Sequence, residues 1–168
     1  MATTYTLISS VTVGSGGAAN IEFTSIPSTY TDLVLKLSGR SNRSETTEFL
    51  NINLNSSASN FDNKTLESAG TSVYSGSYGT YIGSIPAATA TANTFGSFEI
   101  YIPNYAGSNF KSVSSDSASE NNLAQNYQDL IAILWSQTAA ITSIKLVPSN
   151  ASNFVQYSNA YLYGISNA

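Results

Sequence analysis

The segment TFGSFEIYIPNYAGSNFKSVSSD, residues Thr94 to Asp116, shows most clearly how this chain folds. Within it Phe98, Ile100 and Ile102 alternate with other residues, so their side chains point to one face of an extended strand. Pro103 lacks a backbone N–H and has a fixed φ, so the strand is predicted to end there. The segment therefore predicts a strand with one face in a core.

The residues after this strand predict a turn and a second strand. Asn104 and the run 106–109 (AGSN) are residue types typical of turns. The chain then alternates again, with Lys111, Val113 and Ser115 on one side. The two strands form a predicted β-hairpin with a loop of medium length, and most of the chain repeats this pattern.

Similar short alternating runs, separated by glycine, proline and polar residues, predict the other strands. Residues 5–13 and 19–25 are predicted to pair with each other across a Gly-rich turn at 14–18. The remaining predicted strands cover residues 33–39, 49–55, 81–85, 129–135, 141–147, 154–157 and 160–165. A total of about ten short strands is typical of β-sandwiches and barrels. The sequence therefore predicts a single all-β domain over residues 1–168.

Three parts of the chain give weaker or ambiguous patterns. DLIAILW (129–135) is compatible with a buried strand or a helix, and its length and polar flanks favour a strand. Residues 56–79 are the least regular part. In them we predict one short helical turn around Phe61 and Leu66, then an exposed loop over TSVYSGSYGTY (71–81). Residues 117–126 are predicted to be a polar loop.

Composition excludes several classes of site. The chain has no cysteine and no histidine, which removes disulfides, thiolate metal sites and the Ser-His-Asp triad. The net charge is −4 and the six cationic residues are scattered, so nucleic acid is not an expected partner. No secretory signal and no apolar run of about 20 residues is recognisable, so we expect synthesis in a cytoplasm and no membrane span.

Acidic side chains offer two candidate sites, a calcium site and a pair of catalytic carboxylates. Asp116 and Glu120, with Asn121 and Asn122, carry oxygen ligands for calcium, but their spacing does not match a known calcium loop. Glu99 and Asp116 are conceivable as the two carboxylates of a glycosidase. Solvated surface charges are the favoured interpretation of both sets. We therefore predict no catalytic residue, no cofactor and no metal.

Tyrosine and asparagine are the more informative residues. Charged residues make up only 10% of the chain, against about 25% in an ordinary soluble domain, so amides and tyrosines must cover much of the surface. Together the two types suit two tasks, namely stacking on sugar rings and building protein interfaces with an amphipathic ring. Tyr161 and Tyr163 are equally compatible with simply covering the outer face of the last strand. Trp135 is compatible with a place in the core as well as with an interface. The predicted contact residues are Tyr74, Tyr78, Tyr81, Asn51, Asn53, Asn55 and Trp135.

Three stretches of the sequence resemble a known group of proteins. They are YTLISSVTVGSGGAANIEFTSIPSTYTDLVLKLSGR (5–40), TANTFGSFEIYIPNY (91–105) and NFVQYSNAYLYGI (153–165). They are similar to small virion structural proteins of tailed phages, particularly from aquatic environments. The resemblance implies a jelly-roll-like antiparallel β-sandwich without enzymatic activity. It is a likeness of strand pattern, so it assigns no site residues.

The function implied by this resemblance is structural. We expect a capsid decoration (cement) protein that binds the outer shell as a homotrimer and stabilises it. Its partners would be the major capsid protein, or a tail component, and itself, with the protein located on the virion surface. The alternative is a tail-fibre, receptor-binding or carbohydrate-binding β-sandwich module with a glycan as ligand. A β-sandwich hydrolase that uses carboxylates alone is the third hypothesis.

Overall fold

The structure is a computed structural model that describes residues 4–122 and 126–166. Within these ranges the chain forms twelve β-strands and no helix, and hence no helix that could cross a membrane. The strands are β1 (Tyr5–Thr12), β2 (Ile21–Phe23), β3 (Asp32–Gly39), β4 (Thr47–Leu54), β5 (Phe61–Ala69), β6 (Ser72–Gly76), β7 (Tyr81–Pro86), β8 (Gly96–Ile102), β9 (Lys111–Glu120), β10 (Asn126–Trp135), β11 (Ile144–Pro148) and β12 (Asn159–Ile165).

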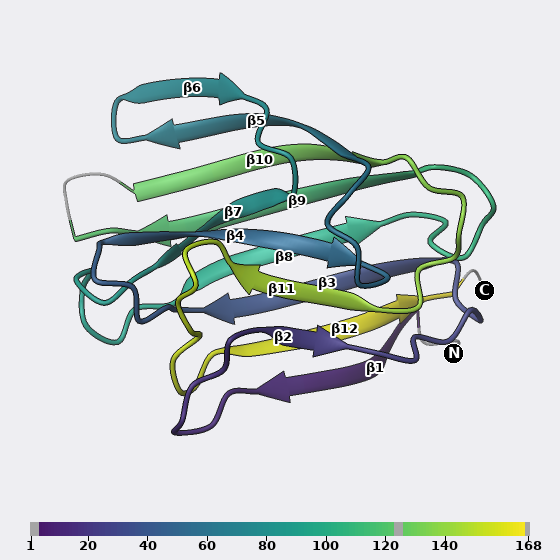
Figure 1. Cartoon of the computed structure of the whole chain (residues 1–168), viewed down its shortest axis with the longest axis horizontal. Coiled ribbons are helices and arrows are strands. Elements are labelled where there is room, and N and C mark those ends of the chain that lie inside the picture. Colours follow the sequence, from purple (N-terminus) through teal and green to yellow (C-terminus); the bar gives the residue numbers. More distant parts are fainter. Residues whose placement is uncertain (1–3, 123–125, 167–168) are drawn as a thin grey trace.

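The strands form two antiparallel sheets of unequal size (Figure 1). The large sheet has eight strands in the order β1-β12-β3-β8-β9-β10-β5-β6, and the small sheet has four in the order β2-β11-β4-β7. The predicted all-β, jelly-roll-like antiparallel sandwich is confirmed. The number of strands is somewhat higher than predicted.

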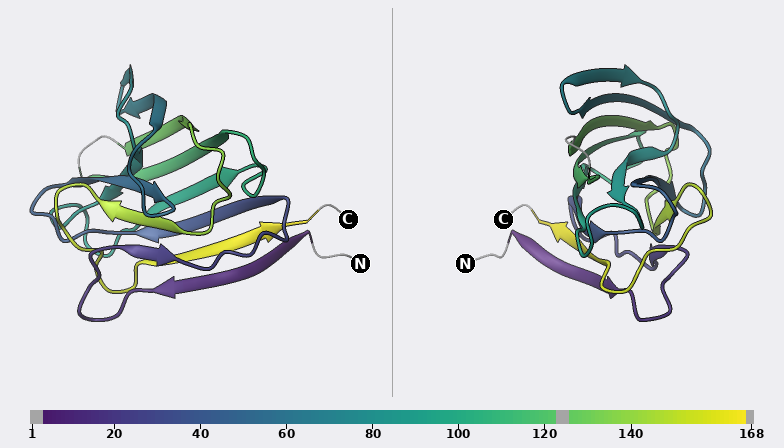
Figure 2. Two further views of the ribbon diagram at one scale, coloured as in Figure 1. Left: turned by 45° about the vertical axis from the view of Figure 1, so that its right-hand side comes forward. Right: turned by 90° about the vertical axis from the view of Figure 1, so that its left-hand side faces the viewer.

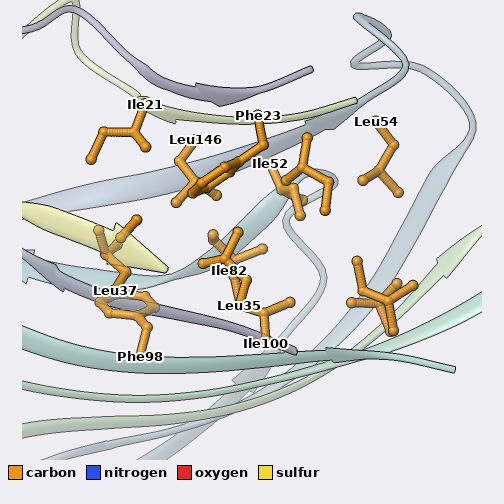
Figure 3. Close-up of a cluster of buried hydrophobic side chains, with 14 of the residues drawn as sticks. Ile21, Phe23, Leu35, Leu37, Ile52, Leu54, Ile82, Phe98, Ile100 and Leu146 are labelled. Atoms are coloured by element: carbon orange, nitrogen blue, oxygen red, sulfur yellow. The ribbon is translucent and has the colours of Figure 1, made fainter. Parts of the chain in front are cut away.

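The hydrophobic core lies between the two sheets (Figure 3). Leu35 and Ile100 project from the large sheet towards Ile52 and Leu146 of the small one, and all four are buried. Burying an aliphatic side chain of this size contributes about 1.5–3 kcal/mol. The alternating apolar positions of the predicted strands therefore supply the main cohesion between the sheets.

The hairpin predicted from residues 94–116 is present as β8 and β9. β8 ends at Ile102, directly before Pro103, and pairs with β9. Lys111 begins β9 with a buried side chain, whose ammonium donates hydrogen bonds to the carbonyl oxygens of Gly107 (2.7 Å) and Asn109 (2.5 Å). Because Lys111 is at an inward position of the strand, its charge is buried, and these hydrogen bonds compensate the cost of burying it.

The large sheet is strongly curved, as Figure 2 shows, and it covers the edge of the small sheet. β7 is an edge strand of the small sheet, yet all six of its residues are buried. It contacts β8, β9 and β10 of the large sheet. Gly83 of β7 has a φ of 133°, and a Cβ there would overlap Phe98 and Ser117. The close approach of β7 to the large sheet therefore depends on this glycine.

The predicted hairpin between residues 5–13 and 19–25 is wrong. β1 pairs with β12 in the large sheet, whereas β2 pairs with β11 in the small one. The Gly-rich turn therefore carries the chain from one layer to the other. β2 buries Ile21 and Phe23 as its alternation predicts, whereas β1 packs only Ile8 and Val11 against the core and leaves Tyr5 and Leu7 exposed.

The predicted helical turn in residues 56–79 is also wrong, because β5 and β6 form a hairpin there. Gly70, with a φ of 61°, lies in its turn. Residues 72–76 of the predicted loop are strand, although residues 72–75 are exposed as predicted. The inward positions of β5 include Asn63 and Thr65, both buried. Polar residues on the buried face removed the apolar alternation by which the other strands were recognised.

Two further predictions need correction. β9 continues to Glu120 along the buried side chains of Ser115, Ser117 and Ser119, so much of the predicted polar loop at 117–126 is strand; residues 123–125 of it lie outside the described ranges. Residues 154–157 form no strand. Phe154 instead makes isolated bridges to Ala18 and Ser41, both outside the strands.

Candidate binding site

A small pocket, which we call the aromatic pocket, opens where β4 and β7 of the small sheet meet β5 of the large one. Its volume is about 270 Å³. β4 contributes Phe49 and Asn51 on its outward face, because Leu50, Ile52 and Leu54 of the same strand point to the core. The other lining residues are Glu67 of β5, Tyr78 before β7, Tyr81 of β7 and Ser149 after β11.

Three aromatic rings define the shape of the aromatic pocket. The ring of Tyr81 is buried and lies edge-on to Phe49, with centroids 5.4 Å apart, and to Tyr78, at 5.9 Å. Phe49 and Tyr78 keep 48% and 57% of their surfaces exposed. The pocket therefore has a fixed aromatic floor between two accessible rings.

Local hydrogen bonding and a glycine hold Tyr78 in place. Its backbone N–H donates to Oδ1 of Asn63 (2.5 Å), and Nδ2 of Asn63 donates to the carbonyl oxygen of Tyr81 (3.1 Å). The Tyr78 ring lies over Gly76, where a Cβ would overlap it. The buried asparagine of β5 thus fixes the turn that carries both tyrosines.

A buried polar group, which we call the Asp129 cluster, lies behind the aromatic pocket. Asp129 of β10 has no exposed surface. Its Oδ1 accepts a hydrogen bond from the Tyr81 hydroxyl (3.1 Å), and its Oδ2 accepts from Ser117 Oγ (2.9 Å) and the Ser84 N–H (3.2 Å). The Tyr81 hydroxyl also lies 2.9 Å from Ser84 Oγ. The cluster ties the floor of the pocket to the large sheet.

Burial dominates the electrostatics of this region. It raises the pKa of Asp129 above its ordinary value, while the hydrogen bonds from Ser117, Tyr81 and Ser84 act in the opposite direction. The pKa of the Tyr81 hydroxyl is also raised, first by burial and then by the charge of Asp129. Glu67 lies directly opposite Asp129 on the neighbouring strand, and its pKa is raised by burial and by that same charge. The site therefore favours neutral groups.

The structure brings together three of the predicted contact residues, namely Tyr78, Tyr81 and Asn51, and places the others apart. Asn51 donates a hydrogen bond to Ser149 Oγ (3.2 Å) at the pocket. Asn53 is half-buried on the same face of β4. Asn55 has a φ of 50° just after β4 and binds the main chain of Thr142 and Ala140 at 2.8 Å, as a turn residue does.

The remaining two predicted contact residues, Tyr74 and Trp135, also lie outside the aromatic pocket. Tyr74 is exposed on β6, opposite Glu67 in the register. Trp135 is in the core and packs against Phe61, so the core alternative considered for the tryptophan applies. It therefore offers no surface for a contact with a partner.

The acidic candidates lie on the outer face of the large sheet. Glu99 and Asp116 are exposed and opposite each other on β8 and β9, and Glu99 pairs with Lys36 at 2.6 Å. Glu120 accepts a hydrogen bond from Thr91 (3.1 Å). Among the described residues, no group of three or more acidic side chains could hold a metal ion.

Sequence reasoning missed Phe49, Glu67, Asp129 and Ser149. Asp129 carried a detectable signal, because it is in phase with Ile131 and Ile133 on the inward face of a predicted strand. A carboxylate at such a position is buried and requires partners. Glu67 carried no comparable signal, since its strand was not recognised.

The comparisons with known proteins give only distant structural likeness. No protein-family model matches the sequence, and no curated protein matches it. Among solved structures, galectin LEC-6 from Caenorhabditis elegans is similar over 94% of this chain and 96% of that chain, with 10% identity and a TM-score of 0.32. CG-16, a homodimeric agglutinin from chicken liver, is similar over 74% of this chain and 98% of that chain, with 16% identity and a TM-score of 0.25.

A third similar structure is a fructofuranosidase from Schwanniomyces occidentalis complexed with fructosylnystose. It covers 99% of this chain and 35% of that chain, with 9% identity and a TM-score of 0.28. All three likenesses are too distant to assign a function to this chain.

Proposed function

We propose that this protein is a non-enzymatic, carbohydrate-binding β-sandwich module and that the aromatic pocket is its binding site. The observation that carries the proposal is the combination of two accessible rings, Phe49 and Tyr78, with amide, hydroxyl and carboxyl groups in one small hollow. A sugar has apolar C–H faces and a rim of hydroxyls. It is complemented by aromatic rings together with a few oriented polar groups.

The polar groups of the pocket suit hydroxyl recognition. The Asn51 amide and the Ser149 hydroxyl are hydrogen-bonded to each other (3.2 Å), so their orientation is fixed before a ligand binds. Glu67 adds a carboxyl group on the opposite strand. Preorganised groups of this kind lose little side-chain entropy on binding, which favours affinity for a small polar ligand.

The environment of the carboxyl groups supports binding rather than hydrolysis. Glycoside hydrolysis requires two carboxyl groups that both reach the sugar. Glu67 lines the pocket, but Asp129 opposite it is fully buried and accepts three hydrogen bonds from the protein. Asp129 is thus occupied in holding the pocket together.

Glycan-array binding followed by calorimetry tests this proposal. Removing the exposed ring in Tyr78→Ala should weaken binding about tenfold, which corresponds to about 1.4 kcal/mol of lost stacking. Tyr161→Ala is the matched control, because it removes an exposed tyrosine from β12, on the outer face of the large sheet. Equal affinity of Tyr78→Ala, Tyr161→Ala and the unaltered protein would refute the assignment, provided that all three melt alike.

As a second candidate function, we propose the virion structural role, and a row of exposed leucines favours it. Leu66 of β5 lies opposite Leu130 of β10, and Leu134 follows on the same outer face of the large sheet. Exposed apolar groups of this kind often mark a protein contact. In this role the face would bind the major capsid protein, a tail component or another copy of this chain within a homotrimer.

The copy number of the chain in purified phage particles tests the second candidate. A number comparable to that of the shell protein supports decoration, and particles that lack the protein should then assemble but lose heat tolerance. A few copies per particle would instead support a tail or fibre location. Absence from particles would exclude the virion role. A homotrimer should also melt at a temperature that rises with concentration.

A further inference from the structure

A second hollow lies beside the aromatic pocket and shares two of its residues. It has a volume of about 240 Å³ and is lined on one side by Thr46, Thr47 and Phe49 and on the other by Glu67 and Tyr127. Phe49 and Glu67 also line the aromatic pocket. The two hollows are therefore neighbours that meet at these two side chains.

The outward face of β4 connects the two hollows. Thr47, Phe49 and Asn51 alternate along this strand, with Thr47 in the second hollow, Phe49 shared and Asn51 in the aromatic pocket. At about 3.3 Å per residue, these three positions extend over about 13 Å. Glu67 and Tyr127 form the opposite wall from neighbouring strands of the large sheet. The hollows thus lie along one track.

Size favours a ligand that spans both hollows. Small-molecule sites have volumes of about 300–1,000 Å³. The aromatic pocket, at about 270 Å³, and the second hollow, at about 240 Å³, each fall below this range, whereas the two together fall within it. Each hollow by itself therefore suits one small unit of a ligand that continues into the other hollow.

The charges along the track favour a neutral ligand. The Arg43 guanidinium at the far end lies 3.8 Å from the Glu48 carboxylate and donates a hydrogen bond to the Thr47 carbonyl oxygen (3.1 Å), so its charge is already compensated. Glu45 also lines this end, and Glu67 stands at the junction. An acidic sugar would meet these carboxyl groups without a free cation to balance them.

We propose that the two hollows form one groove for a neutral, linear oligosaccharide of two or more units. The proposal rests on the carbohydrate-binding function proposed above. The exposed ring of Phe49 packs against the ligand at the junction between two units, and Glu67 accepts hydrogen bonds from hydroxyls on either side. Thr47 and Tyr127 contact the second unit, and Tyr78 contacts the first.

Calorimetric titration of the full chain with a length series tests the groove. The probes are β-1,4-linked glucose and N-acetylglucosamine oligomers of one, two and four units, because such chains are extended. The two-unit probe should bind at least about tenfold more tightly than the one-unit probe, or about 1.4 kcal/mol. Tyr127→Ala and, separately, Thr47→Ala should remove most of this gain and leave one-unit binding unchanged within twofold. Tyr78→Ala should weaken both probes.

The outcomes separate this inference from the function on which it rests. Equal affinity for one and two units, or an undiminished length gain in both Tyr127→Ala and Thr47→Ala, would overturn the groove. The aromatic pocket would stand in that case if Tyr78→Ala still weakened the binding of both probes about tenfold. Tighter binding of oligogalacturonate than of the neutral oligomers would overturn the neutral class of ligand. Failure of the unaltered protein to bind any probe, or any glycan on the array, would overturn both proposals.

Discussion

Asp129→Ala is the substitution that most directly tests how the binding site is built. It removes the acceptor of three hydrogen bonds in a fully buried place. The Tyr81 hydroxyl can turn to Ser84 Oγ, 2.9 Å away, but the Ser84 N–H and the Ser117 hydroxyl lose their partner. An unsatisfied buried donor costs about 1–3 kcal/mol, so two of them should lower the free energy of unfolding by about 2–6 kcal/mol.

Asp129→Asn is the matched variant, because it removes the charge and keeps the shape. The amide oxygen can accept from Ser117 and from the Ser84 N–H, while the amide nitrogen donates to the Tyr81 oxygen. The Tyr81 hydroxyl then donates to Ser84 Oγ, so every group in the cluster retains a partner. We expect Asp129→Asn to unfold within about 1 kcal/mol of the unaltered protein at pH 7, or to be more stable.

The sign of the pH dependence follows from the raised pKa values of Asp129 and Glu67. Because burial makes the folded state hold these protons more tightly than the unfolded state, the associated stability is fully present below the ordinary pKa values of about 4. It is lost as the pH rises through the raised values. The unaltered protein should therefore lose stability relative to Asp129→Asn between pH 4 and pH 8.

Urea unfolding, followed by the fluorescence of Trp135 at pH 4 and pH 8, measures all of these effects. Thermal melts should agree, because 1 kcal/mol corresponds to about 2–4 °C for a chain of this length, so Asp129→Ala should melt at least about 4 °C lower. Unfolding of Asp129→Ala at the same urea concentration as the unaltered protein would refute the role of the cluster. Equal destabilisation by Asn and Ala would show that the charge itself is required.

Three other substitutions probe separate parts of the molecule. Leu35→Ala, in the centre of the core, should lower the free energy of unfolding by about 2–5 kcal/mol, and a smaller value in urea titrations would contradict the core assignment. Lys36→Ala removes the 2.6 Å ion pair with Glu99, but about half of each side chain is exposed (53% and 52%), so stability should change by less than about 1 kcal/mol. Gly164→Ala would place a Cβ against the Tyr30 ring and should lower the free energy of unfolding by about 1–3 kcal/mol. In a double-mutant cycle with Tyr30→Ala, the loss in the double variant should be smaller than the sum of the two single losses.

Strands were predictable wherever apolar residues alternate. β3 and β8 carry leucine, isoleucine or phenylalanine at every second position, and both were recognised within one residue of their observed bounds. β5 carries Asn63, Thr65 and Glu67 at its inward positions, so the same rule failed there. Pairing was less predictable than strand location. A local hairpin between β1 and β2 was the simplest expectation, but both strands pair with segments far along the chain.

The binding site was predictable in part. A tyrosine-rich segment and an asparagine-rich strand were each suspected as contact surfaces, and Tyr78, Tyr81 and Asn51 do lie together. Their proximity arises because the large sheet curves around β7, which no local pattern indicates. Glu67 and Asp129 face each other only through the register of β5 and β10, and this pairing was outside the reach of sequence reasoning.

The pairing of β1 with β12 has a consequence for synthesis in the cell. Tyr5 lies opposite Ile165, and β12 alone connects β1 to the rest of its sheet. Ten strands lie between β1 and β12 in the chain, so β1 leaves the ribosome long before its hydrogen-bonding partner exists. Sheets closed by such distant segments fold slowly. During this delay the uncharged strand YTLISSVT presents open backbone groups, so nascent chains on one messenger are at risk of pairing with each other.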